Sequence, residues 1–249
     1  MIHYSKSGNG PALLLIHGFC ETHEVWSSLT PLLTNNFTVY AIDLPGFGQS
    51  DALPEGFSLT AVASHVRQWV REENLYPFLV VGHSLGGYVV MEWLAQFPMD
   101  AEAYLLFHSS FFEDAPERKE GRTKSIDFVA KNGVGPFVKN LIPHLFYQKL
   151  HPALPEMLEI ASKTTTSTVM EYTRAMRDRV GHGETAKVNT GKLFYLFGEF
   201  DPIISLEAVK KMTENVTPGM VDILPETGHM GMFESPMRAA RFIKSITPR

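Results

Sequence analysis

The sequence predicts an α/β fold: a mostly parallel sheet of about seven strands, with helices on both faces and a helical cap insertion. Two observations predict it. Short apolar runs alternate with segments of helical periodicity along most of the chain, and this order requires crossovers that make neighbouring strands parallel. Residues 111–186 interrupt the alternation, because they contain helical patterns but no strand-like run.

The predicted strands are apolar runs bounded by glycine, proline or polar residues. Residues 12–16 read Ala-Leu-Leu-Leu-Ile, which is typical of a strand buried on both faces. Residues 2–4 are expected to form a short edge strand, followed by a turn at 7–11. The other predicted strands cover residues 37–42, 78–82, 103–107, 192–197 and 220–224.

Helices are predicted between these strands from apolar positions three and four residues apart. In residues 60–73, for example, Val62, Val66, Trp69 and Val70 form one apolar stripe. Further helices are expected at residues 26–33 and 85–97, after Ile204, and from Pro236 onwards.

The break in the alternation divides the chain into two parts. Residues 1–110 and 187–249 are predicted to form an α/β core domain, and residues 111–186 a helical cap inserted in it, with helices near 137–147 and 168–179.

Composition excludes several classes of function. The chain has 249 residues, of which 44% are hydrophobic, and a net charge of −5 without a dense run of Lys and Arg. A nucleic acid or an anionic membrane surface is therefore not expected as a partner, and no apolar run reaches the ~20 residues of a membrane span. We expect a small-molecule substrate, whereas the oligomeric state is left open.

The first residues show neither the basic nor the long apolar segment of a secretory signal, and one cysteine, Cys20, cannot form an internal disulfide. A cytoplasmic location is expected. No cofactor or metal is predicted: spacings typical of zinc ligands are missing, and Gly46-Phe47-Gly48 lacks the third glycine of a dinucleotide-binding loop.

The sequence Gly82-His83-Ser84-Leu85-Gly86 directly follows a predicted strand and precedes a predicted helix. A serine hydroxyl is a weak nucleophile, and a sharp turn between a strand and a helix exposes it for reaction. Ser84 is therefore the candidate nucleophile.

A serine nucleophile needs a base and a carboxylate that orients the base. His229 lies in the loop after the last predicted strand, and Asp201 follows the strand at 192–197, with Glu199 as a weaker rival. The chain order Ser84, Asp201, His229 is the order of one hydrolase fold and of neither protease type. The other histidines, including His17, His83 and His108, are expected to be structural.

Preorganised N–H donors must stabilise the oxyanion that forms during acyl transfer. We expect the backbone N–H of Leu85, at a helix N-terminus, and that of Phe19, in the loop after the strand at 12–16.

Together these motifs resemble the α/β-hydrolase superfamily, in its serine-nucleophile branch. The matching segments span nearly the whole chain; they are residues 17–19, 43–50, 82–86, 198–201, 228–229 and 234–236. The resemblance implies a hydrolase without a cofactor. Relatives that open epoxides or displace halide carry an aspartate where this chain has Ser84, whereas perhydrolases and carbon–carbon bond hydrolases share the serine triad. Fewer residues precede the strand at 12–16 than the family's usual N-terminal hairpin needs.

The leading hypothesis is a serine hydrolase that cleaves a small or medium carboxylic ester or thioester through an acyl-enzyme. One alternative is a carbon–carbon bond hydrolase or lyase that acts on an anionic substrate, which Arg174 or Arg177 would clamp. Another is a non-catalytic ligand receptor that retains the triad. The candidate substrate-binding residues are Phe111, Phe137, Phe146 and Met230.

Overall fold

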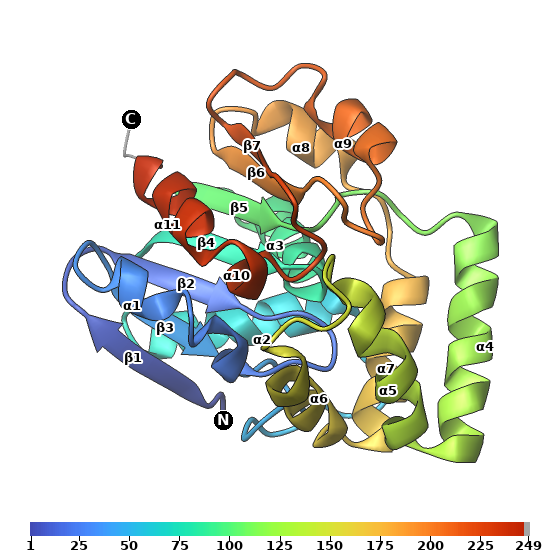
Figure 1. The fold of residues 1–249 in the computed structure, drawn as a ribbon. Helices are drawn as coiled ribbons and strands as arrows, with labels where there is room; N and C mark the ends of the chain where they lie inside the picture. Colours follow the sequence, from blue (N-terminus) through green and yellow to red (C-terminus); the bar gives the residue numbers. More distant parts are fainter. Residues whose placement is uncertain (247–249) are drawn as a thin grey trace.

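The structure is a computed structural model in which residues 1–246 are described, and these contain a seven-stranded sheet in the order β1-β3-β2-β4-β5-β6-β7 (Figure 1). Only β1 runs antiparallel to its neighbour, β3, and the other pairs are parallel. The predicted fold class is thus confirmed. The strands are β1 (Tyr4–Gly8), β2 (Ala12–Ile16), β3 (Thr38–Ile42), β4 (Pro77–His83), β5 (Ala103–Phe107), β6 (Leu193–Gly198) and β7 (Val221–Leu224).

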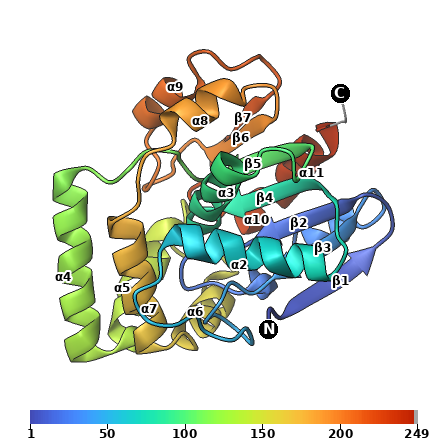
Figure 2. The same cartoon turned by 180° about the vertical axis from the view of Figure 1, so that it is seen from behind.

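Both faces of the sheet are buried. Alternate residues of the central strands point to opposite faces, and each face has its own hydrophobic core. Leu13 and Leu15 of β2 pack on the face covered by α1 (Thr30–Leu33) and α11 (Pro236–Ser245). Leu14 and Ile16 pack on the opposite face with α2 (Leu59–Glu72) and α3 (Leu85–Gln96). Figures 1 and 2 show these two helical layers from the two sides of the sheet.

Four helices between β5 and β6 lie together beyond the carboxyl ends of the strands (Figure 1). They are α4 (Pro116–Asn132), α5 (Val134–Leu145), α6 (Leu154–Ser162) and α7 (Thr166–Arg177). The next helix, α8 (Gly183–Val188), packs instead against α3. The division into a core and a cap at residues 111 and 186 stays a prediction.

Helix α7 is fixed to the loop that follows β3. The Tyr172 hydroxyl donates to the carbonyl oxygen of Pro45 at 2.9 Å, and the Thr168 hydroxyl donates to that of Gly46 at 3.0 Å. The ring centroids of Tyr172 and Phe47 are 4.7 Å apart. Since all five residues are buried or half-buried, these contacts hold α7 above the carboxyl ends of the strands.

Most predicted elements match the observed ones to within one or two residues, but the start of the chain differs. The first strand covers Tyr4–Gly8 rather than residues 2–4, because it pairs along the full length of β3. Gly8 and Gly10, with φ of 87° and 134°, then form the predicted turn.

The helix expected at 26–33 is divided into a 3₁₀ turn at His23–Trp26, labelled η1, and α1. The first turn of α1 contains Pro31, which has no N–H to continue a preceding helix. The last helices are α9 (Leu206–Thr213), α10 (Gly231–Glu234) and α11. Among the described residues, no helix is long and apolar enough to cross a membrane.

Candidate active site

Ser84 lies on the sharp turn between β4 and α3 with φ of 49° and ψ of −110°. Such a positive φ is costly for a residue other than glycine, and it persists only where the surroundings impose it. The Ser84 amide donates to the carbonyl oxygen of Phe107 at 3.0 Å, and the Ser109 hydroxyl donates to the Ser84 carbonyl oxygen at 2.7 Å. The backbone of Ser84 is therefore held from β5 while its side chain stays partly exposed.

Two glycines of the turn are required by close backbone contacts. A Cβ atom on Gly82 would lie 2.3 Å from the Gly86 carbonyl oxygen, and one on Gly86 would lie 2.3 Å from the Ile16 carbonyl oxygen. No side chain can occupy either position without a shift of the backbone. The spacing of the motif thus reflects how closely α3 approaches the ends of β2 and β4.

His229 follows β7 and lies against Asp201, which follows β6. Nδ1 of His229 is 2.8 Å from Oδ2 and 3.0 Å from Oδ1 of Asp201, and both side chains are buried. The His229 amide is anchored to the Leu145 carbonyl oxygen at 2.7 Å. The structure brings together the base and the carboxylate that the sequence predicts 28 residues apart.

Asp201 is an acceptor for several donors at once. Besides His229, it accepts from the amides of Ile203 and Ile204 at 2.8 and 3.0 Å and from Nδ1 of His108 at 2.9 Å. Burial alone would raise the pKa of Asp201, but the two histidines lower it far below its usual range. An ionised carboxylate can only accept, so Nδ1 of His229 carries the proton and Nε2 is left as the basic atom.

His108 is a partner of Asp201 that the sequence reasoning missed. It directly follows β5, whose end lies beside that of β6, and its position at a strand end was the available signal. Burial lowers the pKa of His108 to about 4, although the Asp201 carboxylate opposes this shift. His108 is thus a neutral imidazole that donates one hydrogen bond to the carboxylate.

The loop after β2 is fixed by a second buried carboxylate. Glu21 accepts from the Gly18 amide at 2.6 Å and from Nδ1 of His83 at 3.0 Å, and Nε2 of His83 donates to the His229 carbonyl oxygen at 2.9 Å. Burial alone would lower the pKa of His83, but Glu21 and this carbonyl raise it. The His83 ring therefore links the loop after β2 to the loop of His229.

The two predicted oxyanion donors are the amides of Leu85, which directly follows Ser84, and of Phe19, which lines the same pocket as Ser84. Leu85 is the first residue of α3, so its N–H has no acceptor within that helix. Phe19 follows Gly18, and in the described part of the chain its N–H meets no hydrogen-bond acceptor. Within the described residues neither amide has an acceptor, as the predicted role requires.

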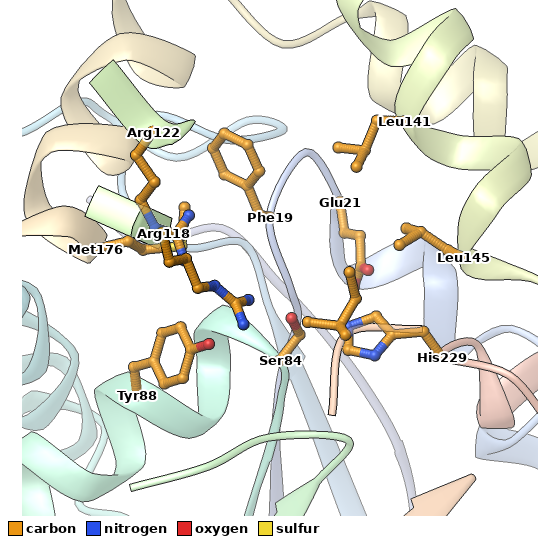
Figure 3. Close-up of a pocket in the computed structure, with 11 residues that line it drawn as sticks. Phe19, Glu21, Ser84, Tyr88, Arg118, Arg122, Leu141, Leu145, Met176 and His229 are labelled. Carbon is orange, nitrogen blue, oxygen red and sulfur yellow. Dashed lines mark hydrogen bonds between the residues drawn. The ribbon is translucent and has the colours of Figure 1, made fainter. Parts of the chain in front are cut away.

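Ser84 and His229 line one pocket of about 100 Å³ between the strand ends and helices α4, α5 and α7 (Figure 3). Within residues 1–246 the Ser84 hydroxyl does not form a hydrogen bond with the His229 imidazole. Hydrogen bonds between a catalytic nucleophile and its base commonly tighten only when substrate binds. The volume is that of a few water molecules, which suits a small acyl group. The other lining residues are Phe19, Glu21, Tyr88, Arg118, Arg122, Leu141, Leu145, Met176 and Ile203.

The aromatic and methionine residues expected to bind substrate lie elsewhere. Met230 is fully buried in the core, and Phe146 stacks on His151 with ring centroids 5.1 Å apart. Phe137 packs edge-on against the ring of Phe19. Four residues were expected to bind substrate: Phe111, Phe137, Phe146 and Met230. In the described chain, none of them lines the pocket of Ser84.

The two arginines expected as a substrate clamp also lie outside this pocket. Arg174 forms an ion pair with Glu171 of its own helix, and Arg177 pairs with Asp178 at 2.8 Å. Glu199, the rival of Asp201, instead accepts from the Glu226 amide at 3.1 Å. Cys20 is fully buried, and burial strongly raises the pKa of its thiol, which disfavours a second nucleophile.

Two groups of side chains bring possible metal ligands within 4.8 Å of one another among the described residues. One is the group around Asp201 with His108 and His229. The other consists of His3, His23 and Asp43, where Nδ1 of each histidine is 2.9 or 2.8 Å from the carboxylate. Hydrogen bonds account for both arrangements, so neither requires a metal.

Comparisons with known proteins agree with this architecture. A model of the alpha/beta hydrolase family matches residues 13–242. A monoacylglycerol lipase, ABHD6 of Mus musculus, is 23% identical over 271 aligned positions, which cover 96% of this chain and 76% of the lipase. An esterase from Thermogutta terrifontis shares the fold with a TM-score of 0.87 and 23% identity, covering 98% of this chain and 91% of the esterase.

Other relatives match over a shorter region. An uncharacterised protein of Mycobacterium tuberculosis is 39% identical over 100 residues, which are 40% of this chain and 29% of that protein. A fluoroacetate dehalogenase of a Burkholderia species is 42% identical over 86 residues, which are 32% of this chain and 28% of the dehalogenase. These matches span less than a third of the relatives' own lengths.

Proposed function

Because the chain belongs to the α/β-hydrolase family, we propose that it is a serine hydrolase that cleaves a small or medium carboxylic ester or thioester through an acyl-enzyme. One observation carries this proposal: Ser84 and His229 line the same pocket, and Nδ1 of His229 is held 2.8 Å from Asp201. The pocket volume of about 100 Å³ favours the small end of this range.

The reaction follows from the positions of these groups. Nε2 of His229 takes the proton of the Ser84 hydroxyl while the oxygen attacks the ester carbonyl carbon. The N–H groups of Phe19 and Leu85 donate to the carbonyl oxygen as it becomes an oxyanion, and losing one such donor typically costs about 3 kcal/mol of transition-state stabilisation.

His229 then gives the proton to the departing alcohol or thiol, which leaves an acyl group on Ser84. A water molecule, deprotonated by His229, releases the acid and restores the hydroxyl. Asp201 keeps its negative charge throughout and stabilises the imidazolium in both half-reactions.

The relatives support ester chemistry more than the alternatives. The mouse relative is a lipase and the Thermogutta protein an esterase. The fluoroacetate dehalogenase matches over less than a third of its length, and the α/β-hydrolases that displace halide carry an aspartate where this chain has Ser84. Arg174 and Arg177 do not line the pocket in the described residues, so these two arginines are not the clamp that an anionic carbon–carbon substrate would need.

A screen of aryl esters of rising acyl length tests the proposal. We expect wild type to hydrolyse the short esters fastest and Ser84→Ala to lose turnover while its circular dichroism spectrum and melting temperature stay unchanged. Equal turnover by Ser84→Ala would contradict the role of Ser84. No turnover of any ester by wild type would favour a receptor that retains the triad.

A further inference from the structure

Two guanidinium groups enter the pocket of Ser84 from the cap. Arg118 and Arg122 lie one turn apart on α4, and both line the pocket together with Ser84 and His229. Figure 3 shows the guanidinium of Arg118 extending towards the space above Ser84. The cap therefore brings positive charge close to the reacting atoms.

This positive charge is only partly balanced. Asp114, whose side chain is 1% exposed, is the carboxylate paired with these arginines: Nε of Arg118 is 3.3 Å from its Oδ1, and Arg122 contacts its Oδ2. A third arginine, Arg179, lies 2.8 Å from the same carboxylate. One negative charge therefore faces three positive charges around Asp114. Two of these arginines, Arg118 and Arg122, line the pocket, where among the described residues Glu21 is the other charged residue and is paired with His83.

The three arginines differ in how many protein groups their guanidinium groups contact. Arg179 is 5% exposed, donates to the carbonyl oxygens of Phe112 and Met176, and stacks over Tyr88, so its role is structural. Arg122 contacts Asp114 and the Met176 sulfur.

Arg118, by contrast, is 43% exposed, and its contact with Asp114 is an ion pair in which Nε lies 3.3 Å from Oδ1. In the described residues its two terminal amino groups form no hydrogen bond with the protein. These paired donors have the geometry that binds a carboxylate in a bidentate manner.

We propose that Arg118, supported by Arg122, binds an ionised carboxylate on the substrate, so that the protein prefers esters carrying a second, free acid group. The inference rests on the proposed ester hydrolysis. Given a pocket of about 100 Å³, the substrate class is the monoester of a short dicarboxylic acid. The ion pair with Asp114 positions Arg118, and the terminal amino groups of Arg118 bind the substrate carboxylate.

The test compares two esters that differ in charge but hardly in shape: monomethyl glutarate and its neutral amide analogue, methyl 4-carbamoylbutanoate. We expect wild type to show a kcat/KM at least about tenfold higher for the anionic ester, because hydrogen bonds to charged groups contribute more than neutral ones. Arg118→Gln should bring the ratio close to one. Arg177→Gln, which removes an arginine of the cap that pairs with Asp178 outside the pocket, should leave the ratio unchanged.

A binding measurement separates this inference from the proposed function. Isothermal titration of Ser84→Ala with the same two esters needs no turnover, and the anionic ester should bind more tightly only while Arg118 is present. Equal binding of the two esters, or a preference that survives Arg118→Gln, would overturn the role of Arg118. Absence of turnover in wild type despite this binding preference would contradict the hydrolase and leave the carboxylate site standing.

Discussion

Nδ1 of His108 lies 2.9 Å from Oδ2 of Asp201, the same oxygen that lies 2.8 Å from Nδ1 of His229. The carboxylate proposed to orient the base is therefore shared by two histidines from different strand ends. His108 has a pKa of about 4, so it donates as a neutral ring and leaves the negative charge available to His229.

Replacing His108 by Leu should weaken both the fold and the reaction. A hydrogen bond to a charged group typically contributes about 1.5–3 kcal/mol, and we expect a loss of free energy of unfolding in this range. The loss of kcat should be smaller than for Asp201→Asn, because the amides of Ile203 and Ile204 still hold the carboxylate. Urea unfolding and ester turnover measure the two effects. A variant as stable as wild type would show that the contact carries no net stability.

Asp201→Asn should lower kcat by several orders of magnitude, as in other serine triads, because the amide favours the wrong tautomer of His229. Ester turnover at neutral pH provides the measurement. Glu199→Gln is the matched control, since it removes a carboxylate of the same loop that bonds to the Glu226 amide instead. A rate that survives Asp201→Asn but falls with Glu199→Gln would reverse the assignment.

Gly86→Ala should destabilise the protein by about 1–3 kcal/mol or prevent its folding, because the new Cβ meets the Ile16 carbonyl oxygen at 2.3 Å. Gly121→Ala in α4 is the control, as its Cβ meets nothing within 4 Å and should add about 0.5–1 kcal/mol. Thermal unfolding compares the two variants. A normal melting temperature for Gly86→Ala would show that the turn can relax.

The pair of His23 and Asp43 should make stability depend on pH. The hydrogen bond that His23 donates to Asp43 raises the pKa of His23, outweighing partial burial, whereas the pKa of Asp43 lies far below its usual range. With the folded pKa above the unfolded value of about 6.5, the stabilisation is fully present below pH 6.5 and is lost as pH rises through the folded pKa.

His23→Gln should therefore lower the melting temperature more at pH 5.5 than at pH 8.5. The control is His144→Gln, because His144 is exposed and, among the described residues, its side chain forms no ion pair. An equal loss for His23→Gln at both pH values would contradict the linkage.

The sequence predicted the sheet and the candidate triad because both depend on local patterns. Apolar runs mark the strands, and parallel strands bring their carboxyl ends to one edge, so Ser84, Asp201 and His229 could be proposed together from their positions after strands. The same rule applied to His108, but its role depends on the distance between two neighbouring strand ends. Sequence spacing does not specify that distance.

The pocket wall could not be predicted in this way. Helix α4 contains few apolar residues, with Ile126 and Val129 its only buried positions, so periodicity gave no sign of which face meets the pocket. Arg118 and Arg122 line the pocket of Ser84 because α4 packs against α7, which is held in place by contacts such as that of Tyr172 with Pro45. The aromatic residues that were expected there, including Phe146, pack into the core instead.

The central claim is that Ser84 is a nucleophile activated by His229. The most direct measurement is mass spectrometry of the protein after incubation with a fluorophosphonate probe, followed by peptide mapping. We expect one probe to be attached per chain, on Ser84 of wild type, with no labelling of Ser84→Ala and labelling at least about a hundredfold slower in His229→Ala. Labelling that is absent from wild type, or that proceeds equally fast without His229, would contradict the account.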